Sequence, residues 1–256
     1  MEDIMNRPLI CRFVAPPRAM IGRLSLSRLA GAMAVCAGAA SAPAVQITYT
    51  YVGVPNGEWN NSNYWTPAGV PGSGANDAAI IPGGFSCRLA NVGPIARTVD
   101  KLQVNAGGQL ELANDYDLYI RGQNDGAGVT GLLTIPGTLV MSSVGNPTDL
   151  MLLGGTFVTF GGGSPSTPAL IEMGNNGQNR IIGAVTNERL DIQPAATIRG
   201  GGQIGANSLS ISNQGTIAAR GSAGITIDPN GSGVTNTGVL RADTGPLALV
   251  NGNFNN

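Results

Sequence analysis

Three segments in the C-terminal part of the chain repeat one pattern of apolar and polar positions. Each begins with an aliphatic residue, continues with small or polar residues that include a turn former, and reaches a second aliphatic residue six places on. The segments are Ile192–Ile198, Ile211–Ile217 and Val234–Leu240, so their offsets are 19 and 23 residues. A near-constant period of this size is typical of repeat architectures, in which each unit stacks on the next.

Within these segments the apolar residues follow the two-residue period of a β-strand, as in Leu190-Asp-Ile192 and Leu209-Ser-Ile211. Gly, Asn, Ser and Thr interrupt each apolar run, so helices are not expected. A coil of two or three short strands cannot bury its apolar face alone. Coils stacked in register about 4.8 Å apart pair their backbones and cover that face. We therefore predict an all-β fold, a right-handed parallel β-helix. A sandwich or barrel of antiparallel strands is the alternative and would need tight hairpin turns.

The same spacing extends the repeat back to Lys101, so residues 101–256 are predicted to form about seven or eight coils of about 20 residues. Two Gly-rich segments, 122–128 and 161–168, are expected to bulge as loops. The chain stops at 251–256, where another coil is expected, so we interpret it as truncated there or as ending in an uncapped coil. Further strands are expected around Leu118–Ile120, Leu133–Ile135, Leu139–Met141, Leu150–Leu152, Thr156–Phe160, Leu170–Met173 and Arg180–Ile182.

Two pairs of aligned turn residues predict contacts between coils. Asn213 and Asn236 occupy one position of the repeat, and stacked asparagines can form a side-chain hydrogen-bond ladder. Gly215 and Gly238 are aligned as well, and we expect them to supply positive φ angles at a corner.

Residues 1–44 have the pattern of a secretory signal peptide. An Arg-containing segment, Met20–Arg28, precedes a short apolar run, Leu29–Ala40, and a small-residue cleavage site at Ala42 or Ala44. The apolar run is too short for a membrane-spanning helix, which takes about 20 residues. We expect Met20 to be the true start and the mature chain to be exported without a membrane span.

Residues 45–100 are predicted to be an N-terminal strand followed by an aromatic capping module. Val45–Val52 alternates as a strand, and both tryptophans, Trp59 and Trp65, follow it with Tyr64 between them. The first coil of a repeat protein has an open apolar end that an atypical segment must cover, and large aromatic side chains suit this task. The alternative is a binding platform on which the same three rings stack against sugars.

This segment also carries a resemblance. The pattern Gly57-x-Trp59-x(5)-Trp65-x(3)-Gly69-x-Pro71, with Asp77-x-Ala79-x-Ile81 after it, resembles the opening of many secreted bacterial β-helix proteins. Those proteins are similar to autotransporter passenger regions and surface adhesins, and residues 190–250 resemble their coils. The resemblance implies a parallel β-helix at the cell surface and says little about any activity.

Composition narrows the possible chemistry. Charged residues make up 11% of the chain, Gly is frequent at 39 residues, and His is absent, which removes the commonest general base. Residues 45–256 carry eight Arg and one Lys against thirteen acids, a net charge of −4. A mildly acidic surface does not favour binding to nucleic acid. No cofactor or metal is expected, and Cys87, alone after removal of the leader, is interpreted as a buried apolar residue.

The candidate catalytic groups are Asp115 and Asp117, which would share one face of an extended segment and could act as an acid/base pair beside Arg97 or Arg121. The alternative is a solvated strand edge. Three further acids are explained as turn residues, and one charged cluster as a surface ion pair. The turn residues are Asp125, Asp149 and Asp228, and the cluster is Glu188, Arg189 and Asp191.

These observations leave two functions open. The first is a secreted or cell-surface, adhesin-like structural protein that presents a repetitive surface to glycan or protein partners. The second is a β-helix polysaccharide lyase or glycoside hydrolase that uses Asp115 and Asp117. The sequence does not indicate the ligand or the oligomeric state.

Overall fold

The structure, a computed structural model, describes residues 46–256 except 75, 91–95, 125–128, 154–156 and 186. The described residues form strands joined by turns, and their only helical element is the short 3-10 turn η1, Ser62–Tyr64. The all-β prediction is therefore confirmed for this part of the chain. No helix within it is long and apolar enough to cross a membrane. The signal peptide predicted at 1–44 lies outside the described residues.

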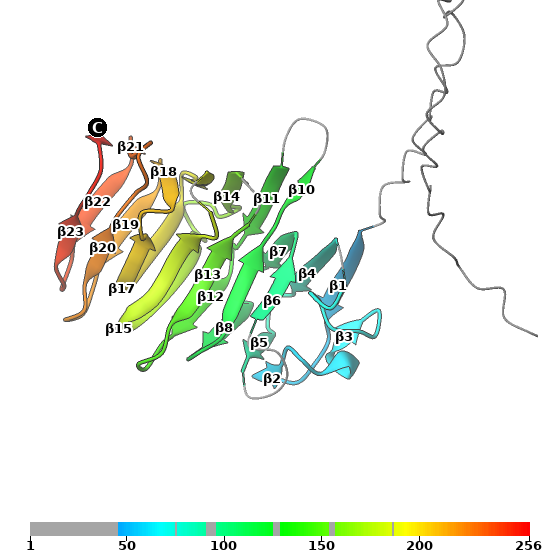
Figure 1. The fold of residues 1–256 in the computed structure, drawn as a ribbon. Coiled ribbons are helices and arrows are strands. Elements are labelled where there is room, and N and C mark those ends of the chain that lie inside the picture. The colour runs from blue at the N-terminus through cyan, green and yellow to red at the C-terminus, as the bar shows by residue number, and fades with distance from the viewer. Residues whose placement is uncertain (1–45, 75, 91–95, 125–128, 154–156, 186) are drawn as a thin grey trace, which may run out of the picture. The chain divides into compact units, whose positions relative to one another are not determined.

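Two large sheets, A and B, contain all of these strands (Figure 1). Sheet A has eleven strands: β1 Ile47–Tyr51, β3 Trp65–Thr66, β4 Asp77–Ile81, β7 Lys101–Val104, β10 Gln123–Asn124, β11 Val129–Thr134, β14 Phe157–Gly161, β16 Glu188–Ile192, β18 Leu209–Asn213, β21 Val234–Asn236 and β24 Phe254–Asn255. Sheet B has thirteen: β2 Gly57–Glu58, β5 Ser86–Leu89, β6 Ala96–Val99, β8 Gln109–Ala113, β9 Asp117–Ile120, β12 Thr138–Ser142, β13 Thr148–Leu152, β15 Ala169–Gly183, β17 Ala196–Gly205, β19 Thr216–Ala219, β20 Ile225–Ile227, β22 Val239–Ala242 and β23 Leu247–Leu249.

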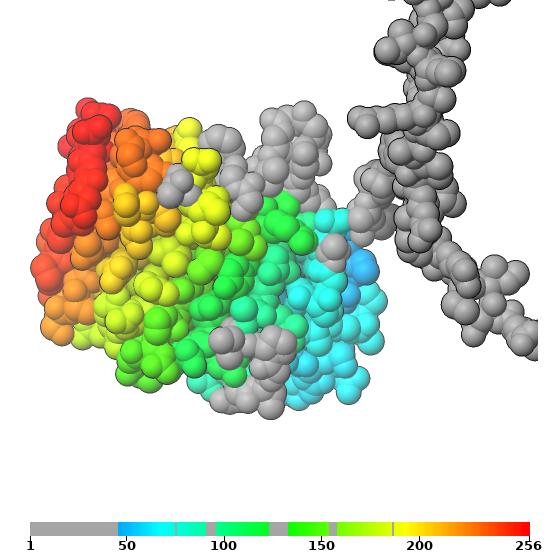
Figure 2. Space-filling model, in the orientation of Figure 1, coloured from blue at the N-terminus to red at the C-terminus, as the bar shows by residue number. Residues whose placement is uncertain are grey.

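From β4 onward the chain visits the two sheets in a repeating order, one strand of A and then two positions of B, except that the β10–β11 hairpin supplies two strands of A in one coil. Each such unit is called a coil below. In two coils a single long strand, β15 or β17, fills both positions of B. Neighbouring coils pair in parallel, and among the described strands only the β1–β3 and β10–β11 pairs are antiparallel. Figure 2 shows successive parts of the chain as adjacent bands. The predicted parallel pairing is confirmed.

Alternation along each strand places one set of side chains in a common interior. In sheet A, Val158, Leu190, Ile211 and Val234 lie in register on four successive strands, and all four are buried. The same holds in sheet B for Ile198 and Ile217, which the sequence pattern also aligned. Burial of such aliphatic side chains stabilises the fold by roughly 1.5–3 kcal/mol each relative to exposure.

One part of the sequence alignment is wrong. Ile192 stacks on Asn213, and the residue in register with Ile211 is Leu190, so the true offset here is 21 residues. The cause is a difference between two corners. The corner after Ile192 has two more residues between sheets A and B than the corner after Asn213 in the next coil. Ala195 in this corner has a φ of 59°, a left-handed conformation that a tight turn needs.

The predicted asparagine ladder is confirmed, whereas the role expected of the aligned glycines is not. Asn213 donates from Nδ2 to Oδ1 of Asn236 at 2.7 Å, and Asn236 donates to Asn256 at 2.9 Å. Gly215 and Gly238 are absent from the positive-φ residues. They are required instead because a Cβ at Gly215 would lie 2.4 Å from a backbone oxygen of the coil below, and one at Gly238 would lie 2.2 Å from the oxygen of Gly215.

The aromatic residues of the segment 45–100 pack at the N-terminal end of the interior. The rings of Trp59 and Trp65 meet edge to face at 4.8 Å, and Tyr51 meets Trp65 at 5.2 Å. Both indole N–H groups are satisfied, by Pro71 O at 3.0 Å and Trp59 O at 2.8 Å. The structure has no boundary at residue 100, because β4 already pairs in register with β7 and β5 with β8.

Candidate functional site

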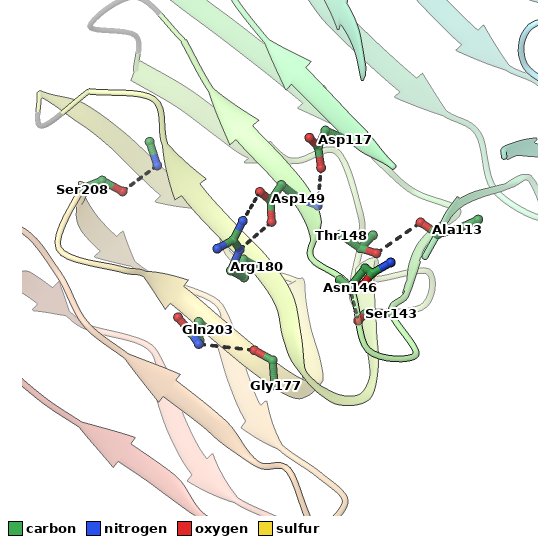
Figure 3. A network of polar contacts seen from close by, with 11 residues as sticks. Ala113, Asp117, Ser143, Asn146, Thr148, Asp149, Gly177, Arg180, Gln203 and Ser208 are labelled. Atoms are coloured by element: carbon green, nitrogen blue, oxygen red, sulfur yellow. Dashed lines mark hydrogen bonds and ion pairs between the residues drawn. The ribbon is translucent and has the colours of Figure 1, made fainter. Parts of the chain in front are cut away.

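A ladder of polar side chains lies on the outer face of sheet B. Asp117 of β9, Asp149 of β13, Arg180 of β15 and Gln203 of β17 follow one another in register across four strands. Their neighbours along the strands, Leu118, Leu150, Ile181 and Ile204, are buried in the interior. Because side chains alternate along a strand, the polar residues face outward. Figure 3 shows the part of this face around Asp149.

Asp149 and Arg180 form the centre of the ladder. Arg180 donates from Nε to Asp149 Oδ1 at 2.7 Å and from Nη2 to Oδ2 at 2.5 Å. Asp149 is 3% exposed, whereas 30% of the Arg180 side chain is exposed. The hydrogen bonds to Asp149 raise the pKa of Arg180, because they favour the charged form of the guanidinium.

Asp117 lies beside this pair in a different electrostatic environment. Its Oδ1 accepts a hydrogen bond from the backbone N–H of Asp149 at 3.2 Å. Partial burial, followed by repulsion from the Asp149 carboxylate, raises the pKa of Asp117 to about 6. The Arg180 charge opposes this change but does not cancel it. Asp117 can therefore hold or release a proton near neutral pH, as a general acid or base does.

The turns next to the ladder are fixed by their own hydrogen bonds. Thr148 Oγ1 donates to Ala113 O at 3.2 Å, and Ser143 Oγ donates to Asn146 O at 2.7 Å (Figure 3). Asn179, which is buried, accepts from the backbone N–H of Ser143 at 2.9 Å and donates to Gly174 O at 2.9 Å. The residues on either side of Asp149 and Arg180 are thus held in one arrangement.

The structure brings together only part of the predicted catalytic group. Asp115 is an exposed turn residue with a φ of 71°, so it does not extend the strand that holds Asp117. Arg97 is in register with the buried Leu118, on the opposite face from Asp117, and donates to Asn60 Oδ1 at 2.7 Å. Burial lowers the pKa of Arg97.

Arg121, the other predicted partner, is engaged elsewhere. It forms an ion pair with the buried Asp100 at 2.8 Å, at the corner between sheets B and A. The arginine whose charge affects the pKa of Asp117 is Arg180. The acid that lies beside Asp117 is Asp149, in place of the predicted Asp115. Sequence reasoning assigned Asp149 to a turn, which is wrong, because it lies within β13. Opposite charges at Asp149 and Arg180 could have indicated this pair, but the sequence does not show that one coil separates the two residues.

The aromatic candidates are placed mainly in the interior. Trp59 and Trp65 are 0% and 2% exposed, so neither indole presents an open face to a sugar ring. Tyr64 is partly exposed and packs edge to face on Tyr51 at 6.2 Å.

The remaining charged candidates divide between the surface and the interior. Arg189 and Asp191 form the expected surface ion pair at 2.6 Å. Glu188, the third member of the predicted cluster, is buried and accepts from the backbone N–H of Val185 at 3.2 Å. Asp228 follows β20 at a corner, as expected for a turn residue, and Asp125 lies outside the described residues.

Cys87 is buried, as predicted, and burial raises the pKa of its thiol well above the usual range. A thiol in this state is a poor nucleophile, because only the thiolate reacts readily. Among the described residues, no group of three or more His, Cys, Asp or Glu side chains is arranged to hold a metal ion.

Comparisons with known proteins identify no relative of this chain. No protein-family model, no curated protein sequence and no solved structure matches it.

Proposed function

We propose that the two sheets are faces of a right-handed parallel β-helix, in which each coil closes around the common interior. The repeating order of one strand in sheet A and two positions in sheet B supports this proposal, since a single direction of winding produces it. Right-handed crossovers are strongly preferred wherever parallel strands are connected.

We further propose that the protein is exported and acts at the cell surface as an adhesin-like structural protein. The observation that carries this proposal is the pairing of opposite charges on the outer faces and at the corners of the coils. Five ion pairs each join positions in adjacent coils: Arg88–Glu111, Arg121–Asp100, Arg180–Asp149, Arg199–Glu172 and Arg220–Asp243. Charges neutralised in this way leave an extended and weakly charged surface, which suits the display of contacts to glycan or protein partners.

The experiment has two steps and uses the full chain. Export is tested by producing the chain with a C-terminal epitope in a bacterium and sequencing the exported protein, whose N-terminus should follow Ala42 or Ala44. Binding is tested by titrating the labelled exported protein onto intact cells, before and after removal of surface glycans or surface proteins. Saturable binding that one of these treatments abolishes supports the proposal. Retention of an uncleaved chain in the cytoplasm, or no saturable binding to any cell type, contradicts it.

A second candidate function is favoured by the pKa of Asp117. A carboxyl group that titrates near pH 6 beside a carboxylate–arginine pair resembles the unequal acid pairs of carbohydrate-active enzymes. In this alternative Asp117 transfers the proton, and partial burial together with the Asp149 carboxylate raises its pKa. Incubation of the full chain with a panel of polysaccharides tests it. Release of new chain ends that is lost in Asp117→Asn but kept in Asp115→Asn would favour the enzyme over the surface protein.

A further inference from the structure

A polar groove of about 420 Å³ crosses the outer face of sheet A near its C-terminal end. Its volume lies within the range of small-molecule binding sites. The lining comes from β16, β18, β21 and the turns beside them. It consists of Asn187, Arg189, Ser210, Ile211, Ser212, Asn230, Ser232, Gly233 and Thr235.

The polar groups of this groove are almost all uncharged hydroxyls and amides. Its one charged residue, Arg189, is compensated by Asp191, whose Oδ1 lies 2.6 Å from Arg189 Nε. The groove therefore has many hydrogen-bonding groups and no net charge. A ligand that fits it is neutral and rich in hydroxyl groups, because an anion or cation would lose its hydration without gaining an uncompensated charge.

The walls of the groove are fixed before any ligand arrives. The turn that carries Asn230 and Ser232 is held by the Asn230 N–H, which donates to Leu209 O at 2.7 Å, and by Asn230 Oδ1, which accepts from the Ser232 N–H at 2.9 Å. Ser210 Oγ donates to Glu188 O at 3.3 Å. Preorganised polar groups bind with a smaller loss of conformational entropy.

The position of the groove within the sheet favours a sugar over an extended peptide as the ligand. Strand β18 pairs with β16 on one side and β21 on the other, and β21 also pairs with β24. The backbone groups under the groove are thus used within the sheet, and a peptide cannot add there as a further strand. Recognition must come from side chains such as Ser212 and Thr235, which are in register on adjacent strands and face outward.

We propose that this groove binds a neutral oligosaccharide. The proposal rests on the surface function proposed above and specifies its site and ligand class. The hydroxyls of Ser212 and Thr235, repeated at the spacing of adjacent strands, bind sugar hydroxyls directly, and the exposed Asn187 and Ser232, which also line the groove, add further hydrogen bonds.

The test measures binding of the full chain to an array of neutral and acidic glycans, followed by titration calorimetry with the best soluble hexasaccharide. Ser212→Ala combined with Thr235→Val should weaken binding at least tenfold, since each lost hydrogen bond reduces affinity several-fold. The matched control is Thr226→Val, at a partly exposed threonine on β20 of sheet B, and it should leave affinity within twofold. Raising the salt concentration from 0.05 to 0.5 M should change affinity by less than about twofold.

Three results of the glycan measurements would each overturn the groove proposal. They are failure to bind any neutral glycan of the array, equal affinity in the groove variant and the Thr226→Val control, and preference for acidic glycans with strong salt dependence. If the groove variant still binds intact cells as the wild type does, the groove is wrong while the surface function stands. If the wild type binds no cells at all, the surface function itself fails. Loss of cell binding after protease treatment alone would indicate a protein partner and also overturn the groove proposal.

Discussion

Nδ2 of Asn213 donates a 2.7 Å hydrogen bond to Oδ1 of Asn236, which occupies the same position one coil later. Asn213 is fully buried, and its Oδ1 also accepts from the backbone N–H of Gly215 at 3.1 Å. The residues below it in the same column are apolar, namely Leu102, Leu133, Phe160 and Ile192. The interior column thus changes from apolar stacking to a side-chain ladder at Asn213.

The ladder makes Asn213 more sensitive to substitution than Asn236. Asn213→Ala removes the partner of the Gly215 N–H at a buried position and the donor to Asn236 Oδ1, and should lower the free energy of unfolding by about 1–3 kcal/mol. Asn236→Ala, at a partly exposed position, should cost about 0.5–1.5 kcal/mol. Urea denaturation of both variants measures the difference. Equal losses, or no loss in Asn213→Ala, would contradict the ladder.

Gly215 should not tolerate a side chain, although its φ is not positive. Gly215→Ala places a methyl group against backbone oxygens of the coil below, at 2.4 and 2.7 Å, and should destabilise the fold by about 2 kcal/mol or more. Gly177→Ala is the matched control, because a Cβ there meets nothing within 4 Å. Thermal unfolding of the two variants compares them, and similar melting temperatures would disprove the close approach of the coils.

Removal of Arg180 should lower the stability of the fold, because the buried Asp149 carboxylate loses its ion-pair partner. Arg180→Met removes the ion-pair partner of Asp149, which is 3% exposed, and we expect a loss of about 2–4 kcal/mol at pH 7. Adding Asp149→Asn should restore part of that stability. A double-mutant cycle measures the coupling between the two side chains, and a coupling energy near zero would contradict the assigned ion pair.

Asp117 should make stability depend on pH between about 4 and 6. Its pKa is about 6 in the folded chain and about 3.9 in an unfolded one, so the folded state holds more protons within this range. Rising pH therefore removes stability there. Asp117→Asn should be more stable than the wild type at pH 7.5 by about 1 kcal/mol, after allowance for partial exposure, and the gain should vanish below pH 4.

Urea denaturation across this pH range measures the gain. Asp115→Asn is the control, since Asp115 is an exposed turn residue at a φ of 71° that Asn also adopts. If the stability gained in Asp117→Asn does not change with pH, burial and the Asp149 charge do not raise the pKa of the Asp117 carboxyl.

The repeating strands could be predicted from the sequence because the apolar period is visible in every segment. Leu118–Ile120, Leu139–Met141 and Leu150–Leu152 all lie in strands at the expected places. The register was less predictable, because the coils differ in length. Val234 and Phe254 are paired across 20 residues, whereas Val158 and Leu190 are paired across 32.

Because the coils differ in length, the polar ladder on sheet B could not be predicted from the sequence. Asp149 and Arg180 are 31 residues apart, a separation that no fixed period of about 20 residues relates. Asp115 and Asp117 are two residues apart in sequence, a spacing that predicts a shared face only if both lie in one strand, but Asp115 lies in the turn before β9 and Asp117 in β9 itself. The raised pKa of Asp117 depends on burial and on a carboxylate from the next coil, and neither can be inferred from its own segment.

The central claim, that coils wind in parallel around one dry interior, is tested most directly by methyl NOE spectroscopy of the Ile-, Leu- and Val-labelled protein. We predict methyl contacts from Leu190 to Ile211 and from Ile211 to Val234, together with contacts from Ile198 to Ile217. The amide protons of these residues should exchange slowly with solvent. Strong contacts between the Hα protons of β16 and β18, which are typical of antiparallel pairs, or rapid exchange at these positions, would contradict the claim.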